Sequence, residues 1–119
     1  MTEDQITKLS ARAAHEVTCL RYRAFGVPVL GWEDAEMTDA LRAEIIEGAR
    51  LTLAGSSPEV VHTAWWKRRV DAGWVFGPVK SFEAKTHPGL IPYDQLPEFN
   101  KQERVLFQAV VRATAASLR

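Results

Sequence analysis

The sequence contains a single cysteine, Cys19, which has no partner for an internal disulfide. One thiol also leaves no cysteine pair for a zinc site, and this scarcity is typical of proteins kept in a reducing compartment. The sequence lacks a charge excess as well, because 15 lysines and arginines balance 15 aspartates and glutamates. Without a net positive charge, we do not expect a broad surface that binds nucleic acid.

Long hydrophobic runs are also missing. No apolar stretch approaches the length of a membrane span, and the N-terminus lacks the basic start and apolar run of a signal peptide. We therefore expect a cytoplasmic protein with no membrane partner.

Motifs for catalysis are absent too. The sequence has neither the G-x-S-x-G motif of a nucleophile elbow nor the G-x-x-x-x-G-K-[ST] motif of a phosphate loop. His15 and Cys19 stand at a spacing that suits metal ligands on a helix, but two ligands do not make a site, so we expect Cys19 to be buried in the core. We expect no catalytic residue, no cofactor and no metal.

What is present is the composition of one globular domain covering residues 1–119. Hydrophobic residues make up 46% and charged residues 25% of the chain, which is the range of folded proteins. A chain of 119 residues is long enough to bury a core without disulfides.

Helix start and stop signals predict four helices. Thr2 and Gln5 have the spacing of a capping box and predict a first helix over 3–24. Thr38 predicts a second helix ending near residue 54, and Ser57-Pro58 a third that runs to about residue 72. Pro97 opens the last helix.

Apolar residues at helical spacing predict which faces are buried. The stripe on the first helix is Ile6, Leu9, Ala13, Val17 and Leu20, and the stripe on the last helix is Leu106, Val110 and Ala113, widened by Phe107 and Val111. Between the third and fourth helices, a glycine and proline-rich segment predicts an ordered aromatic loop, or a very short β-hairpin. The fold class is therefore mainly α, with about four helices packed around this loop.

Rare residue types recur at fixed offsets in the second half of the chain. In order they are His62, Trp65, Arg69, Val70, Gly73, Trp74, Phe76, Gly77, Pro78, Lys85, His87, Pro88, Leu90, Pro92, Tyr93, Leu96, Pro97 and Lys101. This pattern resembles the Ryr domain of the ryanodine receptor family, with its H-x-x-W, G-W-x-[YF]-G-P and H-P-x-L-x-P-[YF]-x-x-L-P motifs. Two pairs depart from the family. Ser81-Phe82 replaces the usual Asp-Asp, and Glu103-Arg104 replaces the Lys-Asp of phage-type members and would form a reversed salt bridge.

The resemblance implies a non-catalytic binding or regulatory module. In animal channels such domains belong to a large cytoplasmic assembly, and in bacteria they accompany sensor and defence architectures for which nucleotide-derived ligands have been proposed. It implies a small stand-alone protein of bacterial or phage type, located in the cytoplasm of a bacterium or of a phage-infected host cell. Residues 57–119 would form the domain core and residues 1–56 an N-terminal helical extension.

One interpretation places a nucleotide-derived ligand between the third helix and the loop. Aromatic rings would stack on a base, while Arg68, Arg69, Lys80 or Lys85 would lie near its phosphates. The candidate ligand-binding residues are Trp66, Arg69, Trp74, Phe76, Lys85, His87 and Tyr93. The candidate structural residues of the motif are His62, Trp65, Gly73, Gly77, Pro88 and Pro92.

Two other interpretations stay open. Neighbouring helical residues point about 100° apart, so Trp65 and Trp66 are not both expected in the core, and Trp66 is the better candidate for an exposed position. Trp66 and the basic face of the third helix would then bind a protein partner or a second copy of the chain. Lys67-Arg68-Arg69 is too small a patch to favour nucleic acid.

Overall fold

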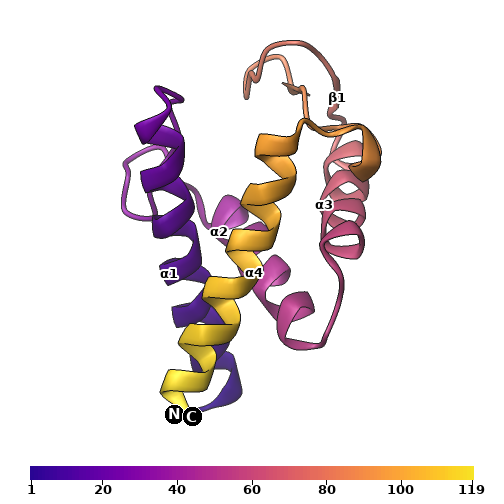
Figure 1. The fold of residues 1–119 in the computed structure, drawn as a ribbon. Helices are drawn as coiled ribbons and strands as arrows, with labels where there is room; N and C mark the ends of the chain where they lie inside the picture. Colours follow the sequence, from indigo (N-terminus) through magenta and orange to yellow (C-terminus); the bar gives the residue numbers. More distant parts are fainter.

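The computed structural model describes all residues from 1 to 119 and shows four α-helices (Figure 1). They are α1 (Glu3–Ala24), α2 (Asp39–Leu53), α3 (Pro58–Asp71) and α4 (Glu98–Leu118). Between α3 and α4 lie the strands β1 (Val75–Phe76) and β2 (Thr86–His87) and the short 3-10 helix η1 (Tyr93–Gln95). The predicted fold class, mainly α with about four helices, is confirmed.

Side-chain caps fix the start of the first three helices. The Thr2 hydroxyl accepts from the Gln5 amide while the Gln5 side chain accepts from the Thr2 amide, so the predicted capping box is present. The hydroxyls of Thr38 and Ser57 accept from the backbone three residues on and start α2 and α3. At the other end of α3, Gly73 has φ of 92°, a left-handed conformation that ends the helix at the predicted place.

Helices α1 and α4 lie side by side and antiparallel, and α3 lies on the side of α4 away from α1 (Figure 1). Helix α2 crosses behind α4 and contacts the other three helices. The two chain termini meet at one end of the molecule, where Arg119 Nη2 lies 2.7 Å from Glu3 Oε2. The segment containing β1 and β2 caps the opposite end of α4. None of the helices is long and apolar enough to cross a membrane.

Small residues form the line along which the helices meet. The innermost cluster consists of Ala11, Ala14, Ala49 and Val111, all without exposed surface. Larger apolar side chains from α2 and α4 pack around it; they are Ile45, Ile46, Leu53, Phe107 and Val110. Close approach of the helix backbones therefore depends on alanines, and the bulky residues flank the contact.

The predicted buried faces of α1 and α4 are therefore right only in part. Ile6 of the predicted stripe on α1 is buried. Leu9 and Leu20 keep 44% and 66% of their surface exposed, whereas Ser10 and Thr18 are buried. On α4 the predicted Val111 is in the core and Val110 packs against it, whereas the predicted Ala113 is exposed. The periodicity of large apolar residues marks the flanks of these helices, because the contact line itself is made of small residues.

The two strands pair in parallel, Val75 with Thr86 and Phe76 with His87, and not as the hairpin that the sequence left open. The chain between them turns back on itself through an antiparallel bridge from Ser81 to Thr86. Gly77 permits this arrangement, since a Cβ there would lie 2.7 Å from the Cβ of Thr86. In this loop Lys80 is exposed and His87 is half-buried.

Candidate functional site

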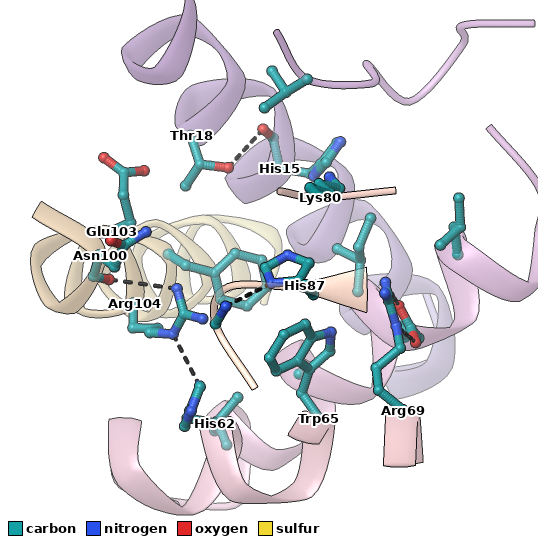
Figure 2. Close-up of a pocket in the computed structure, with 18 of the residues that line it drawn as sticks. His15, Thr18, His62, Trp65, Arg69, Lys80, His87, Asn100, Glu103 and Arg104 are labelled. Carbon is teal, nitrogen blue, oxygen red and sulfur yellow. Dashed lines mark hydrogen bonds and ion pairs between the residues drawn. The ribbon is translucent and has the colours of Figure 1, made fainter. Parts of the chain in front are cut away.

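A cavity of about 890 Å³ lies among the four helices and the 77–89 loop (Figure 2). Cavities of a few hundred to a thousand cubic ångströms are the usual size for small-molecule sites. Basic side chains from three separate segments reach into this one, and they give it its chemical character.

Arg69 of α3 forms one wall. Its side chain is only 8% exposed, and its Nε and Nη2 donate to the two carboxylate oxygens of Glu44 at 2.6 and 2.8 Å. The guanidinium carbon lies 4.3 Å from the ring centre of Trp74 and 5.4 Å from that of Trp65. Its Nη1 is buried and has no hydrogen-bond partner in the protein. One donor of this rigidly held cation is therefore unsatisfied and enclosed by protein atoms.

Arg104 of α4 is oriented by His62 of α3. His62 Nε2 lies 2.7 Å from the carbonyl oxygen of Ile91 and must donate to it, so His62 Nδ1 is an acceptor. Arg104 Nε donates to this Nδ1 at 3.3 Å, and Arg104 Nη1 makes a long contact of 3.5 Å to the carbonyl oxygen of Asn100. Burial lowers the pKa of both His62 and Arg104. Arg104 forms no ion pair with a carboxylate.

His87 of β2 stands among these cations. Its Nδ1 accepts from the Gly89 backbone amide at 2.8 Å, so the proton of the neutral ring is on Nε2. That Nε2–H makes no hydrogen bond within the protein, and the ring packs edge-on against Trp65. Burial, and then the nearby positive charges of Lys80, Arg69 and Arg104, lower its pKa to about 4. His87 is therefore a neutral hydrogen-bond donor at neutral pH.

Lys80 reaches the cavity from the loop between the strands (Figure 2). The residue keeps access to solvent, yet protein atoms crowd its ammonium group, and this burial, together with Arg69, lowers its pKa. Lys80 makes no ion pair, and its only aromatic contact is with Phe82 at 5.3 Å. It is the most available cation of the group.

The carboxylates around the cavity form no ion pair with Lys80 or Arg104. Three of the carboxylates in the lining, those of Glu44, Glu47 and Glu103, pair with Arg69, Arg50 and Arg21 respectively. The fourth, Asp71, is exposed and forms no ion pair. Glu103, expected from sequence to pair with its neighbour Arg104, instead pairs with Arg21 of α1, because the two residues of one helix point in different directions. Its side chain is 3% exposed, and burial raises its pKa.

The structure separates the residues that the sequence suggested for ligand binding. Arg69 and His87 line the cavity, as do His62, Trp65 and Pro88 of the structural set. The other ligand-binding candidates lie outside the lining, and they are Trp66, Trp74, Phe76, Lys85 and Tyr93. The remaining structural residues Gly73, Gly77 and Pro92 also lie outside it, at the end of α3, beside β1 and before η1.

The outlying candidates have other contacts. Trp74 is buried beneath Arg69, and Phe76 is 58% exposed on the surface. Lys85 has a left-handed φ of 54°, and its Nζ donates to the carbonyl oxygen of Ala72 at the end of α3. Trp66 is half-buried against His62, and Tyr93 meets His62 edge-on. The aromatic residues of the motif thus do not gather around one cavity.

Trp65 lines the cavity, but its ring is already covered. His87 packs against it at 4.9 Å, His62 at 5.6 Å, and Arg69 and Arg104 lie over it at 5.4 and 5.9 Å between centres. The tryptophan therefore holds the basic groups in place and has no free face on which a base would stack.

Arg104 and His15 are the site residues that the sequence interpretation missed. Arg104 lies 42 residues after His62 in the sequence, and no spacing rule predicts a contact between residues so far apart. The only signal was the Glu103-Arg104 departure from the family pattern. His15 lines the cavity from α1, where its Nε2 is 2.6 Å from the carbonyl oxygen of Leu30. Cys19, buried as predicted, contacts the same His15 nitrogen at 3.4 Å.

This arrangement supplies hydrogen-bond donors and positive charge to one cavity. A family model for the RyR domain matches residues 45–116, which is more than half of the chain. The matched segment contains Arg69, Lys80, His87 and Arg104, while the α1 wall of the cavity lies outside it.

Proposed function

Because the chain belongs to the RyR domain family, we propose that it is a non-catalytic binding or regulatory module that takes a small, nucleotide-derived anion into the cavity. The observation that carries this proposal is that Lys80 and Arg104 line the cavity without an ion-pair partner. A crowded cation costs free energy when nothing replaces its hydration, and a bound anion would remove that cost.

The only cysteine is not set up as a nucleophile. His15 Nε2 must carry a proton to donate to the Leu30 carbonyl oxygen, so it cannot accept one from Cys19. Burial also raises the pKa of the Cys19 thiol, which keeps it protonated. Cys19 therefore gives the cavity no activated thiol nucleophile.

A nucleotide panel tests the proposal. Mono-, di- and cyclic nucleotides and ADP-ribose derivatives would be titrated while tryptophan fluorescence and thermal unfolding are recorded. Trp65 in the cavity wall should report a saturable change, and a ligand that binds the folded state should raise Tm with concentration. Silence across the whole panel would contradict the proposal, and self-association or a protein partner bound through Trp66 would be tested next.

Lys80→Gln should weaken binding of any ligand found by about tenfold, which is the worth of one charge-assisted hydrogen bond of about 1.5 kcal/mol. The matched control is Lys8→Gln, which removes the same charge from the exposed face of α1. Lys85→Gln tests whether the ligand binds in the cavity or on the outer face of the loop, because Lys85 lies outside the cavity lining. Loss of binding in Lys85→Gln with none in Lys80→Gln would move the site to the outer face of the loop.

A further inference from the structure

The Lys80 side chain reaches the cavity from the loop between the strands. Its ammonium group interacts electrostatically with side chains of four other elements; they are Cys19 of α1, Glu44 of α2, Arg69 of α3 and His87 of β2. Figure 2 shows Lys80 above the His87 ring, with Arg104 and Arg69 on opposite sides of that ring. This one amine therefore faces groups from all the elements around it, although the residue keeps contact with solvent.

None of these neighbours neutralises a Lys80 ammonium group. Glu44 is the only carboxylate among them, and both of its oxygens accept from Arg69. Cys19 is a thiol whose pKa is raised by burial, and His87 is uncharged at neutral pH. Burial, and then the charge of Arg69, lower the pKa of Lys80, so a larger fraction of this amine is unprotonated than of an ordinary lysine.

The other lysines of the chain have different surroundings. Lys8 forms an ion pair with the acid one turn before it, and Lys85 and Lys101 donate to backbone carbonyl oxygens. Lys67 is the best matched to Lys80, because it also borders the cavity, is exposed and forms no ion pair. Lys80 differs from it in the protein atoms that crowd its ammonium group.

The lining offers partners for the rest of a ligand on the other side of His87. Arg104 is oriented by His62 and forms no ion pair with a carboxylate. Side-chain oxygens that can accept hydrogen bonds also belong to this part of the lining, and they are those of Thr18, Tyr22 and Asn100. A ligand that carries both an anionic group and hydroxyl groups would therefore find partners for each.

We infer that Lys80 captures the aldehyde group of a small phosphorylated ligand as a reversible imine. The lone pair of Nζ attacks the carbonyl carbon, a C=N bond replaces the C=O bond, and the carbonyl oxygen leaves as water with the two protons of the amine. No oxidant or reductant is needed, and hydrolysis returns the free amine, so the ligand is held without turnover. The inference rests on the proposed function, because the same cavity must hold the phosphate.

Pyridoxal 5′-phosphate is the probe, because it carries an aldehyde and a phosphate monoester on one small ring. Added to the full chain at neutral pH, it should produce the visible absorption band of an imine. Sodium cyanoborohydride then reduces the C=N bond to a stable secondary amine, which peptide mass spectrometry locates. Lys80 should be modified about tenfold faster than Lys67, because a charge-assisted hydrogen bond from Arg104 holds the phosphate nearby.

Two related ligands and two variants separate the imine from simple binding. Pyridoxal lacks the phosphate and should modify Lys80 about tenfold more slowly. Pyridoxine 5′-phosphate has an alcohol in place of the aldehyde, so it should bind and compete without modifying the protein. Lys80→Arg keeps the positive charge but cannot form an imine, and it should lose the absorption band while still binding pyridoxine 5′-phosphate. Lys67→Arg is the matched control and should keep the band.

The outcomes distinguish this inference from the proposed function. Equal modification of Lys67 and Lys80, or an unchanged absorption band in Lys80→Arg, would overturn the imine. Binding of a nucleotide to the same protein would then leave the proposed function standing. Modification of Lys80 that is equally fast with pyridoxal would overturn the phosphorylated ligand, since no cation of the cavity would be holding the phosphate. If no phosphate compound binds and Lys80 is not preferred, both proposals fail.

Discussion

His87 is kept neutral by its neighbours and by one backbone amide. The local H-P-G sequence places Gly89 where its N–H meets Nδ1, and cations from α3, α4 and the loop oppose a second proton. The histidine itself was predictable from the motif. Its protonation state was not, because Arg104 and Lys80 come from segments that no local pattern connects to it.

This environment predicts a loss of stability in mild acid. The folded pKa of His87, about 4, lies below the ordinary value of 6.5, so the unfolded chain binds the proton more readily. The free energy of unfolding should be highest above pH 6.5 and fall as pH drops toward 4, by at most about 1.4 kcal/mol per pH unit for this one group. His62, whose pKa is also lowered, acts in the same direction.

Urea unfolding at several pH values between 4 and 7 measures this slope. His87→Asn, whose amide oxygen can still accept from Gly89, should show a flatter dependence. A variant as pH-dependent as the unaltered protein would show that His87 does not cause the loss.

At the scale of elements, the sequence predicts where helices begin and end better than it predicts which helix faces are buried. Caps are local, so Thr2, Thr38 and Ser57 identified where helices begin. Burial depends on the partner helix, and here the contact runs through alanines and through the polar residues Ser10, Thr18, Glu103 and Gln108. A rule based on large apolar residues finds Ile6 and Val111 but misses the alanines and polar residues of this line. The parallel pairing of β1 and β2 was also beyond local reasoning, because it depends on how the intervening loop turns back.

Gly77→Ala should destabilise the loop. The new methyl group would lie 2.7 Å from the Cβ of Thr86, a contact that must be relieved by moving one strand. We expect a loss of about 1–3 kcal/mol in the free energy of unfolding and weaker anion binding, since Lys80 and His87 move with the loop. Chemical denaturation and fluorescence titration measure the two effects.

Val79→Ala is the control for this change, because Val79 lies in the same loop and is 70% exposed. It should alter the free energy of unfolding by no more than about 0.5 kcal/mol. An equal effect of the two substitutions would mean that the loop tolerates displacement and that Gly77 has no special role.

At the scale of the whole molecule, the cavity joins parts that the sequence interpretation kept apart. The family match begins at residue 45, yet α1 supplies Ala11 and Ala14 to the core and His15 to the cavity wall. Sequence periodicity indicates how many helices form but not where they leave space between them. The location of the site therefore required the tertiary structure.

Removal of residues 1–36 should abolish cooperative folding. The fragment would expose Val111 and Ala115 and leave the buried Glu103 without Arg21, and loss of one partner from a buried ion pair costs about 3–5 kcal/mol. Thermal unfolding followed by circular dichroism should show no sigmoidal transition. A fragment that melts cooperatively and still binds an anion would demonstrate that α1 is dispensable.

The meeting of the two termini beside the Glu3–Arg119 ion pair has a consequence for how this domain can be combined with others. Both connections leave the molecule from one point, so a host protein could accommodate the whole domain within one of its surface loops, as a guest that does not force the host's strands or helices apart. The cavity lies toward the opposite end of the molecule and would remain facing outward from such a host. By the same geometry, a short linker could join the two ends into a closed ring without unwinding α1 or α4.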